Sequence, residues 1–286
     1  MNRIRLDEDW TLCQTKGNET SGRIFKLRHI PCQVHDALIQ EGIIENPNLK
    51  GFNNDRWIGK SDWRYEKIFS LEDISGSWNL ILEGLDTFAD IYFNGVRVAR
   101  NESAYMPCRI EGLTGVQKGE NRLRLEFKAP EQVLKEIELP EKYGEYVPDF
   151  CKARVFRSGF HDFSGPHPDL VRIGIYGHIW LEQVKTNGFR DITATVQMDP
   201  ALSWGKMISE ISYWDDSQEK ETLHYIIKDP AGRVVLEGEE NASHILEICL
   251  EEPMLWWPRS HGSQNLYELE IRLMAGDDLL DISRKK

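Results

Sequence analysis

The feature that most constrains the fold of this chain is an alternation of apolar and polar residues in short runs along most of its length. Leu123, Leu125 and Phe127 alternate with charged residues. The run Ala89–Phe93 also alternates and ends at Asn94-Gly95, a pair typical of a type I′ hairpin turn. A period of two places every second side chain on one face, as in a half-buried β-strand. Many short strands with little helix predict β-sandwiches.

Helix and turn signals are few. Apolar spacing predicts a short helix at Val34–Gln40 and another at Pro130–Ile137, where proline stands in the first turn. Gly119-Glu120-Asn121 is typical of a turn before a strand, and the polar stretch Lys185–Gly188 interrupts the strand pattern. We therefore expect two sandwich domains, residues 1–185 and 186–286.

Charge and cysteine content limit the partners and the compartment. The formal net charge of −12 disfavours binding to nucleic acid, and no apolar run is long enough for a membrane span. The five cysteines include no C-x-x-C pair, which favours buried thiols over disulfides or a zinc site. We expect no metal and no cofactor. The cytoplasm is the favoured location, with a periplasmic or secreted location possible if a leader was removed.

The chain is rich in aromatic residues, several of them in polar surroundings. It has nine Trp, nine Tyr and eleven Phe, and Trp57 and Trp63 flank the stretch Ile58–Asp62. Exposed rings beside carboxylates suit sugars, whose C–H faces stack on rings while their hydroxyl groups bind polar side chains. The alternative is that these rings form ordinary sandwich core. The sequence leaves both interpretations open.

Five segments resemble β-mannosidases of glycoside hydrolase family 2. Residues 57–63 resemble W-I-G-E-S-D-W, and residues 84–95 resemble G-L-D-T-F-A-D-V-Y-L-N-G. Residues 30–35 resemble V-P-G-x-V-H, residues 174–182 resemble G-I-W-R-x-V-x-L-E, and residues 256–267 resemble W-W-P-x-G-Y-G-x-Q-x-L-Y. The segments follow the order of the family and extend over nearly the whole chain.

The resemblance implies an order of domains and a location for the catalytic residues. Such enzymes begin with a galactose-binding-like jelly-roll sandwich, continue with an immunoglobulin-like sandwich, and end with a (β/α)₈ barrel that holds both catalytic glutamates. A barrel needs about 250 further residues. We therefore expect no catalytic barrel and no catalytic residue in this chain, which would be inactive alone. It would be a fragment of a larger enzyme, truncated near the end of its second sandwich.

The same resemblance gives candidate substrate-binding residues. In the family, a loop reading F-G-W-D-W-G-P reaches the sugar, and Phe160–Pro166 is the similar segment here. The favoured alignment makes His161, Asp162 and Phe163 the counterparts of W-D-W, with Ser164 as an insertion. A second alignment places Phe163 at the Asp of the family. A third possibility is that the segment is only a surface turn.

Two classes of function follow. The first is the substrate-framing part of a β-mannosidase-like exo-glycosidase, with a β-mannoside and the missing barrel as partners. Gly177 stands where the family has Arg. Because of this departure, a relative that acts on a glucuronide or galactoside is an alternative within the same class. The second class is a stand-alone carbohydrate-binding or interaction module. A scaffold without ligand contacts is a third option.

Overall fold

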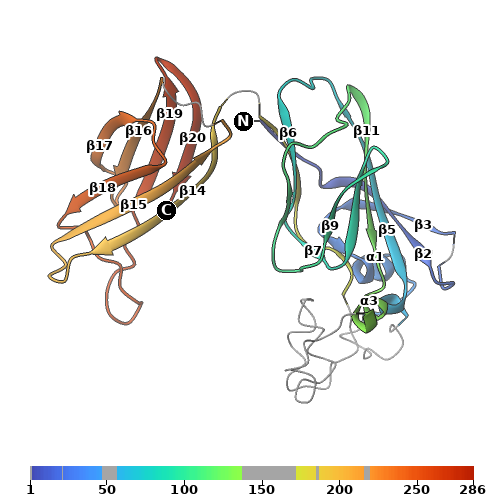
Figure 1. The fold of residues 1–286 in the computed structure, drawn as a ribbon. Helices are drawn as coiled ribbons and strands as arrows, with labels where there is room; N and C mark the ends of the chain where they lie inside the picture. Colours follow the sequence, from blue (N-terminus) through green and yellow to red (C-terminus); the bar gives the residue numbers. More distant parts are fainter. Residues whose placement is uncertain (1, 21, 47–56, 137–171, 185–186, 216–219) are drawn as a thin grey trace. The chain divides into compact units, whose positions relative to one another are not determined.

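Antiparallel strands dominate the chain, as the alternating sequence predicts. The structure, a computed structural model, describes residues 2–20, 22–46, 57–136, 172–184, 187–215 and 220–286. It divides into two units, residues 2–183 and residues 184–286, and each unit has its own hydrophobic core. Each unit is a sandwich of antiparallel sheets (Figure 1). The all-β prediction is confirmed.

The first sandwich contains thirteen of the strands and all the described helices. Its elements are β1 (Asn2–Arg5), β2 (Glu8–Lys16), β3 (Ile24–His29), β4 (Cys32–Gln33), α1 (Val34–Gln40), the 3₁₀ helix η1 (Ile58–Lys60), β5 (Asp62–Leu71), β6 (Ser77–Leu82), β7 (Leu85–Asp86), β8 (Ala89–Phe93), β9 (Val96–Asn101), β10 (Cys108–Ile110), β11 (Gly119–Phe127), α3 (Pro130–Glu136), β12 (Gly174–Ile175) and β13 (Ile179–Val184).

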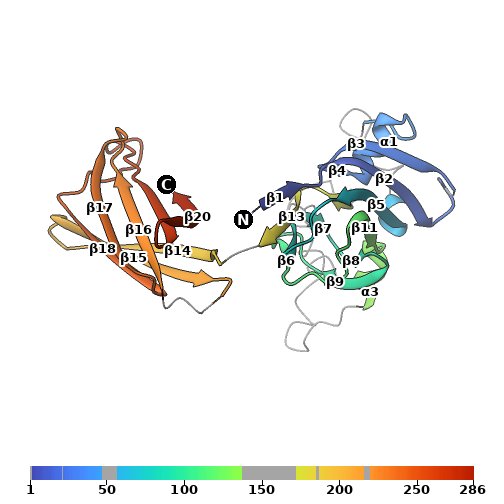
Figure 2. The same ribbon diagram turned by 90° about the horizontal axis from the view of Figure 1, so that it is seen from above.

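Two large sheets of this sandwich enclose the core between them (Figures 1 and 2). The six-stranded sheet has the order β3-β2-β5-β11-β8-β9, and the four-stranded sheet has the order β1-β13-β6-β10. A small third sheet, β4-β12-β7, joins three segments that are far apart in the sequence. The core is formed by side chains such as Trp63 on the larger sheet and Leu181 on the smaller one, both fully buried.

Strand β5 shows how the alternation builds this core. Trp63, Tyr65 and Leu71 point inward and are buried, as the period of two requires. Lys67 falls on the same inward face, and its ammonium group donates a hydrogen bond to the carbonyl oxygen of Glu8 at 2.5 Å. Burial lowers the pKa of Lys67. A lysine therefore occupies an inward position of the strand, where the carbonyl oxygen of Glu8 and the nearby carboxylates of Asp7, Glu8 and Asp9 stabilise its charge.

The predictions of the hairpin and of the first helix are confirmed, whereas the prediction of one turn is wrong. Strands β8 and β9 pair through Asn94 and Gly95, whose φ angles of 47° and 86° fit a type I′ turn. Helix α1 spans Val34–Gln40, as predicted. The expected turn at residues 119–121 already belongs to β11, where Gly119 pairs with Leu71. With a φ of 85°, Gly119 can turn the chain and begin the strand at one residue.

The described residues of the second sandwich form seven strands. They are β14 (Phe189–Met198), β15 (Trp204–Tyr213), β16 (Glu221–Lys228), β17 (Val234–Asn241), β18 (Ile245–Glu251), β19 (Glu268–Ala275) and β20 (Asp278–Lys285). A three-stranded sheet, β14-β15-β18, faces a four-stranded sheet, β17-β16-β19-β20. Seven strands divided three and four are typical of an immunoglobulin-like sandwich. The core between the sheets includes Leu223, Leu246 and Leu273, all fully buried.

The cysteine prediction is only partly correct. Cys32 is buried, and its burial raises the pKa of the thiol to about 11. Cys249 is exposed, because Leu246 and Ile248 take the inward positions of β18 and Cys249 falls on the outward face. Both thiols are free. Among the described residues, no helix is long and apolar enough to cross a membrane.

Candidate functional site

The sugar-contacting residues predicted from the sequence, His161, Asp162 and Phe163, lie outside the described residues. The described residues nearest to them on either side are known. The last one before them is Glu136, at the end of helix α3, and the first one after them comes shortly before strand β12. The residues around β12 therefore form the frame of the candidate site.

Strand β12 is the middle strand of the small sheet. Gly174 pairs with Gln33 of β4 on one side and with Asp86 of β7 on the other. Its φ is +126°, and a Cβ at this position would lie 2.3 Å from the hydroxyl oxygen of Tyr65. That hydroxyl donates a hydrogen bond to the carbonyl oxygen of Cys32 at 2.9 Å. Only glycine can bring β12 into contact with both flanking strands here.

A second close approach explains a departure from the mannosidase pattern. The N–H groups of Tyr176 and Gly177 both donate to the carbonyl oxygen of Gly84, at 3.0 and 3.3 Å. A Cβ on Gly177 would lie 2.6 Å from the backbone nitrogen of Gly84, and a Cβ on Gly84 would lie 2.7 Å from that of Gly177. A side chain at position 177, such as the Arg of the family, cannot be accommodated by this backbone.

A buried histidine and a partly buried glutamine lie on the β4 side of the frame. His35 is 8% exposed, and burial lowers its pKa to about 4, so the imidazole is neutral at pH 7. The N–H of Val34 donates to the carbonyl oxygen of Ile173 at 2.9 Å, which anchors the start of α1 beside β12. Neither Nδ1 of His35 nor Nε2 of Gln33 has a hydrogen-bond partner among the described residues.

A buried carboxylate lies on the β7 side. Asp86 and Thr87 are both fully buried, and the Thr87 hydroxyl donates to the Asp86 carboxylate. The side chain of Asn101 donates to the carbonyl oxygens of Thr87 and Ser103, at 2.7 and 2.9 Å. These bonds hold the chain after β7 against the end of β9. The carboxylate of Asp86 is thus part of a buried, hydrogen-bonded structure.

Among the described residues of the frame, Asp86 supplies a buried carboxylate and Gln33 an amide. Gln33 and Asp86 flank Gly174 on opposite sides, so their Cα atoms are separated by two strand spacings, about 10 Å. Retaining glycoside hydrolysis needs two carboxylates about 5–5.5 Å apart, and the frame presents one buried carboxylate with an amide and an imidazole. No group of three potential metal ligands occurs in the part of the chain that the structure describes.

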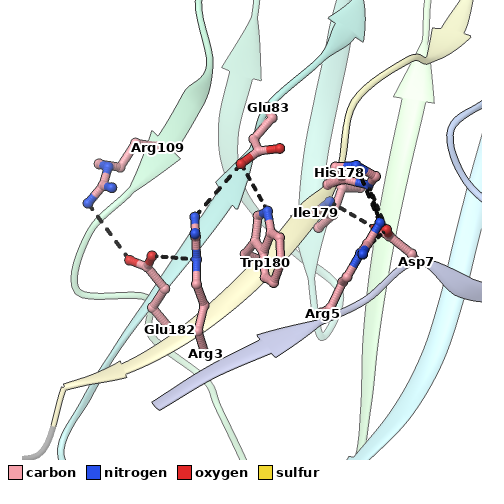
Figure 3. A network of polar contacts seen from close by, with 9 residues as sticks. All are labelled: Arg3, Arg5, Asp7, Glu83, Arg109, His178, Ile179, Trp180 and Glu182. Atoms are coloured by element: carbon pink, nitrogen blue, oxygen red, sulfur yellow. Dashed lines mark hydrogen bonds and ion pairs between the residues drawn. The ribbon is translucent and has the colours of Figure 1, made fainter. Parts of the chain in front are cut away.

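A larger polar network lies on the four-stranded sheet (Figure 3). Arg3 of β1 forms an ion pair with Glu182 of β13 at 3.0 Å, and its guanidinium lies 4.2 Å from the ring centroid of Trp180. The indole N–H of Trp180 donates to Glu83 at 2.9 Å. Arg109 of β10 lies 3.8 Å from the other oxygen of Glu182. Glu182 is thus a buried carboxylate between two arginines.

The second half of the network is built around Asp7 (Figure 3). Its carboxylate binds the side chain of Arg5, lies 2.7 Å from Nδ1 of His178, and accepts the N–H of Ile179 at 3.2 Å. Three arginines therefore balance three carboxylates over the whole network. Since the charges are paired with one another and Arg3 covers the Trp180 ring, we assign the network a structural role. It attaches the N-terminal strand β1 to β13.

Some aromatic rings belong to the sandwich core, and others are exposed, so each of the two interpretations of the aromatic residues holds for part of the chain. Trp63 is fully buried, with its ring 5.9 Å from that of Trp57, so the stretch that the sequence singled out belongs to the first core. The exposed indoles are those of Trp204, Trp256 and Trp257 in the second sandwich, at 43%, 54% and 43%. The polarity of the neighbouring residues could not indicate which rings are exposed, because polar neighbours on a strand occupy the opposite face.

Comparisons with known proteins place both sandwiches in one family. A profile described as "Glycosyl hydrolase 2 galactose-binding domain-like" matches residues 10–177, more than half of the chain. A second profile, "Glycosyl hydrolases family 2", matches residues 186–286. The predicted order of a galactose-binding-like jelly-roll and an immunoglobulin-like sandwich is thereby confirmed, as is the resemblance found in the sequence motifs.

Individual proteins match along almost the whole chain. Beta-mannosidase B from Thermothelomyces thermophilus is 24% identical over 298 residues, covering 99% of this chain and 34% of that protein. The crystal structure of a β-D-mannosidase from Dictyoglomus thermophilum has a TM-score of 0.83 at 24% identity, covering 99% of this chain and 36% of that one. A β-glucuronidase from an uncultured Clostridium gives a TM-score of 0.64 at 17% identity, covering 99% and 44%. The chain thus spans about a third of the length of the curated relative.

Proposed function

Because the chain belongs to glycosyl hydrolase family 2, we propose that it is the N-terminal, substrate-framing part of a β-mannosidase-like glycosidase. The observation that carries the proposal is the similarity to a curated β-mannosidase over 99% of the chain. The substrate class that this implies is carbohydrate, and a terminal β-mannoside is the specific substrate that we propose. The two catalytic carboxylates belong to the part of the parent protein that this chain does not match.

The proposed contribution of this chain is the binding and orientation of the terminal sugar. The carboxylate of Asp162 accepts a hydrogen bond from a sugar hydroxyl, and the rings of His161 and Phe163 flank the same sugar. A charge-assisted hydrogen bond of this kind contributes about 1.5–3 kcal/mol when it is buried. The frame around β12 supports the proposal, because two buried residues that follow that segment, Gly174 and Ile175, pair with β4 on one side and with β7 on the other.

A second candidate is a hydrolase of another β-glycoside, such as a glucuronide or galactoside. The observation that favours it is Gly177, where the backbone approaches Gly84 too closely for the Arg of mannosidases. A cationic side chain is thereby missing from a position near the frame. If that position contributes to sugar selection in mannosidases, the preference of this parent protein differs from theirs.

The substrate is tested by kcat/KM of the complete parent protein on 4-nitrophenyl β-mannoside, β-glucuronide and β-galactoside. We expect the mannoside to be preferred by at least about tenfold, or about 1.4 kcal/mol in transition-state binding. A preference for the glucuronide or galactoside would establish the second candidate. The 286-residue chain alone should hydrolyse none of the three. A micromolar dissociation constant of this chain for a simple sugar would indicate a true binding module.

The role of Asp162 is tested by substitution in the parent protein. Asp162→Ala should lower kcat/KM by about 10–150-fold, the equivalent of the lost charge-assisted hydrogen bond, and should leave the thermal midpoint nearly unchanged. Asp169→Ala is the matched control, because it removes a carboxylate seven positions further along the same segment. If both variants retain full activity and stability, the segment is a surface turn. A large loss of stability in Asp162→Ala would make it a structural residue.

A further inference from the structure

The first sandwich contains a polar cavity apart from the frame around β12. Its volume is about 570 Å³, within the range of small-molecule sites. The cavity lies where β1 passes into β2, beside the last residue of β3 and the second half of β5. The residues of β4, β7 and β12 that form the frame do not line it. It is therefore a separate candidate site.

Lys67 of β5 brings a buried positive charge to this cavity. The residue is 9% exposed, and its ammonium group has three N–H donors. One of them donates to the carbonyl oxygen of Glu8 at 2.5 Å, and no further acceptor for the group occurs among the described residues. A buried charged donor without an acceptor is costly. The remaining donors of Lys67 therefore require acceptors from solvent or from a ligand in the cavity.

Two carboxylates that line the cavity are open to donors. Glu8 and Asp9 are exposed, and within the described ranges neither side chain takes part in a hydrogen bond or an ion pair. The carboxylate of Asp7 differs, because it is already bound to Arg5 and His178 (Figure 3). The cavity thus combines free acceptors on β2 with free donors on β5.

The remaining lining supplies an apolar surface. Ile30 and Leu71 are 3% and 4% exposed, and the ring of Phe69 is half-buried beside them. The imidazole of His29 and the hydroxyl of Ser70 are exposed at the same cavity. An apolar surface with a few convergent donors and acceptors fits the C–H face and the hydroxyl groups of a sugar.

The charges of the cavity select a neutral ligand. The carboxylates of Asp7, Glu8 and Asp9 outnumber the cations of Arg5 and Lys67, so an anion is repelled. A cation that approaches the free carboxylates meets the ammonium group of Lys67. A hydroxyl group is neutral, and it can accept a hydrogen bond from an ammonium group while it donates one to a carboxylate. Two adjacent hydroxyl groups can therefore satisfy the donors and the acceptors together.

We propose that this cavity is a second saccharide site, in which adjacent hydroxyl groups of a neutral sugar bridge Lys67 to the carboxylates of Glu8 and Asp9. The site is separate from the proposed contact of Asp162 with the terminal sugar, and it is complete within the first sandwich. It goes beyond the function proposed above. A second site of this kind keeps a longer saccharide near the protein after its terminal sugar has been released.

Ligand-observed saturation-transfer NMR on the 286-residue chain provides the test, with methyl β-mannoside as the probe. We expect a dissociation constant of about 1–10 mM, because the site is open and makes few hydrogen bonds. Lys67→Met removes the ammonium donors but keeps an unbranched side chain, and should raise that constant at least about tenfold. Lys26→Met changes an exposed lysine of β3 outside the cavity, and should leave the constant unchanged.

A second variant keeps the test decisive if Lys67→Met does not fold. Asp9→Asn retains the shape of the side chain, and asparagine tolerates the φ of 54° at this position. It replaces a charge-assisted hydrogen bond with a neutral one, so it should weaken binding at least about threefold. Circular dichroism and the thermal midpoint show whether each variant is folded.

Four results would overturn the proposal. No saturation transfer at about 100 mM probe would show that the cavity holds only water. Unchanged binding in folded Lys67→Met or in Asp9→Asn would place the sugar elsewhere. Loss of binding in Asp162→Ala would assign the probe to the candidate segment. Inorganic phosphate that binds more tightly than the probe, and that Lys67→Met abolishes, would make the cavity an anion site.

The outcome is separable from that of the proposed function, because binding by the 286-residue chain is measured without catalysis. A parent protein that hydrolyses the β-mannoside, while this chain binds no probe, retains the function and excludes the second site. A parent protein that is inactive on the mannoside, while Lys67 and Asp9 are required for binding of the probe, retains the second site and excludes the function.

Discussion

The two sandwiches of this chain use tryptophan in opposite ways. In the first, Trp10, Trp63 and Trp78 are 1%, 0% and 4% exposed and lie in a single core between the sheets. In the second, Trp204, Trp256 and Trp257 are 43–54% exposed, and two of them line an open groove. The same residue type thus supplies packing in one domain and accessible surface in the other.

The difference indicates where the tryptophans stabilise a core. A sandwich stabilises itself by burying apolar area, and each large ring removed from water contributes about 1.5–3 kcal/mol. The first sandwich obtains this contribution from the three indoles within its own sheets. The second leaves Trp204, Trp256 and Trp257 largely accessible, and its core contains the aromatic rings of Phe189 and Tyr213 instead. The tryptophans of the first domain should therefore contribute more to stability than the exposed tryptophans of the second.

The largest expected effect separates the two domains directly. Trp63→Ala removes a fully buried ring and should lower the free energy of unfolding by about 3–5 kcal/mol. The matched variant Trp257→Ala removes a ring that is 43% exposed and should cost less than about 1 kcal/mol. Urea unfolding followed by circular dichroism measures both. Equal losses would contradict the contrast between the domains.

A pH effect of similar size is expected in the first sandwich, from His35. The pKa of His35 is lowered by burial to about 4, against about 6.5 in an unfolded chain. Between these values the unfolded chain binds a proton that the folded chain does not. The contribution of His35 is therefore complete above pH 6.5, decreases as the pH falls, and is lost at about pH 4. The total amounts to about 3 kcal/mol.

The His35 effect is measured as the slope of unfolding free energy against pH between 4 and 6.5. In His35→Gln, the slope should correspond to about one proton fewer taken up on unfolding, whatever the variant does to stability at pH 7. His29→Gln, at an exposed position of the same domain, serves as the control. An unchanged slope in His35→Gln would show that the imidazole accepts a proton in the folded state.

Smaller effects are expected from a feature that the two domains share, a buried glutamate between two arginines. Glu270 lies 2.5 Å from Arg272 and 2.7 Å from Arg284, and although its burial acts to raise its pKa, hydrogen bonds from both arginines lower it. Glu182 has longer contacts, 3.0 and 3.8 Å. Glu270→Gln should cost about 1.5–3 kcal/mol, and Glu182→Gln about 1 kcal/mol. A larger loss for Glu182 would contradict the order given by these distances.

Much of the secondary structure could be predicted because it depends on local rules. Alternation located β8 and β11, and the pair Asn94-Gly95 fixed the hairpin, since a type I′ turn requires positive φ at both positions. Helix α1 followed from its apolar spacing. The same rules placed Gly119 in a turn, because its sequence neighbours do not reveal that it pairs with Leu71 across the sheet.

The frame of the candidate site could not be predicted in this way. Gln33, Asp86 and Gly174 meet only because β12 pairs with β7 and with β4, across intervals of 88 residues or more. Arg3 and Glu182 form their ion pair across a similarly large separation. Charge and polarity in the sequence do not reveal such pairing. Lys67 is a related case, because a lysine on an inward position needs the carbonyl of Glu8 from another strand.

The central claim is that Trp10, Trp63 and Trp78 of the first sandwich are enclosed, whereas Trp204, Trp256 and Trp257 of the second are accessible. It is tested most directly by acrylamide quenching of tryptophan fluorescence in the 286-residue chain. We expect a readily quenched component that disappears when Trp204, Trp256 and Trp257 are all replaced by Phe, and that persists in Trp10→Phe, where the ring is 1% exposed. A triple variant that is quenched as readily as the unmodified chain would contradict the claim.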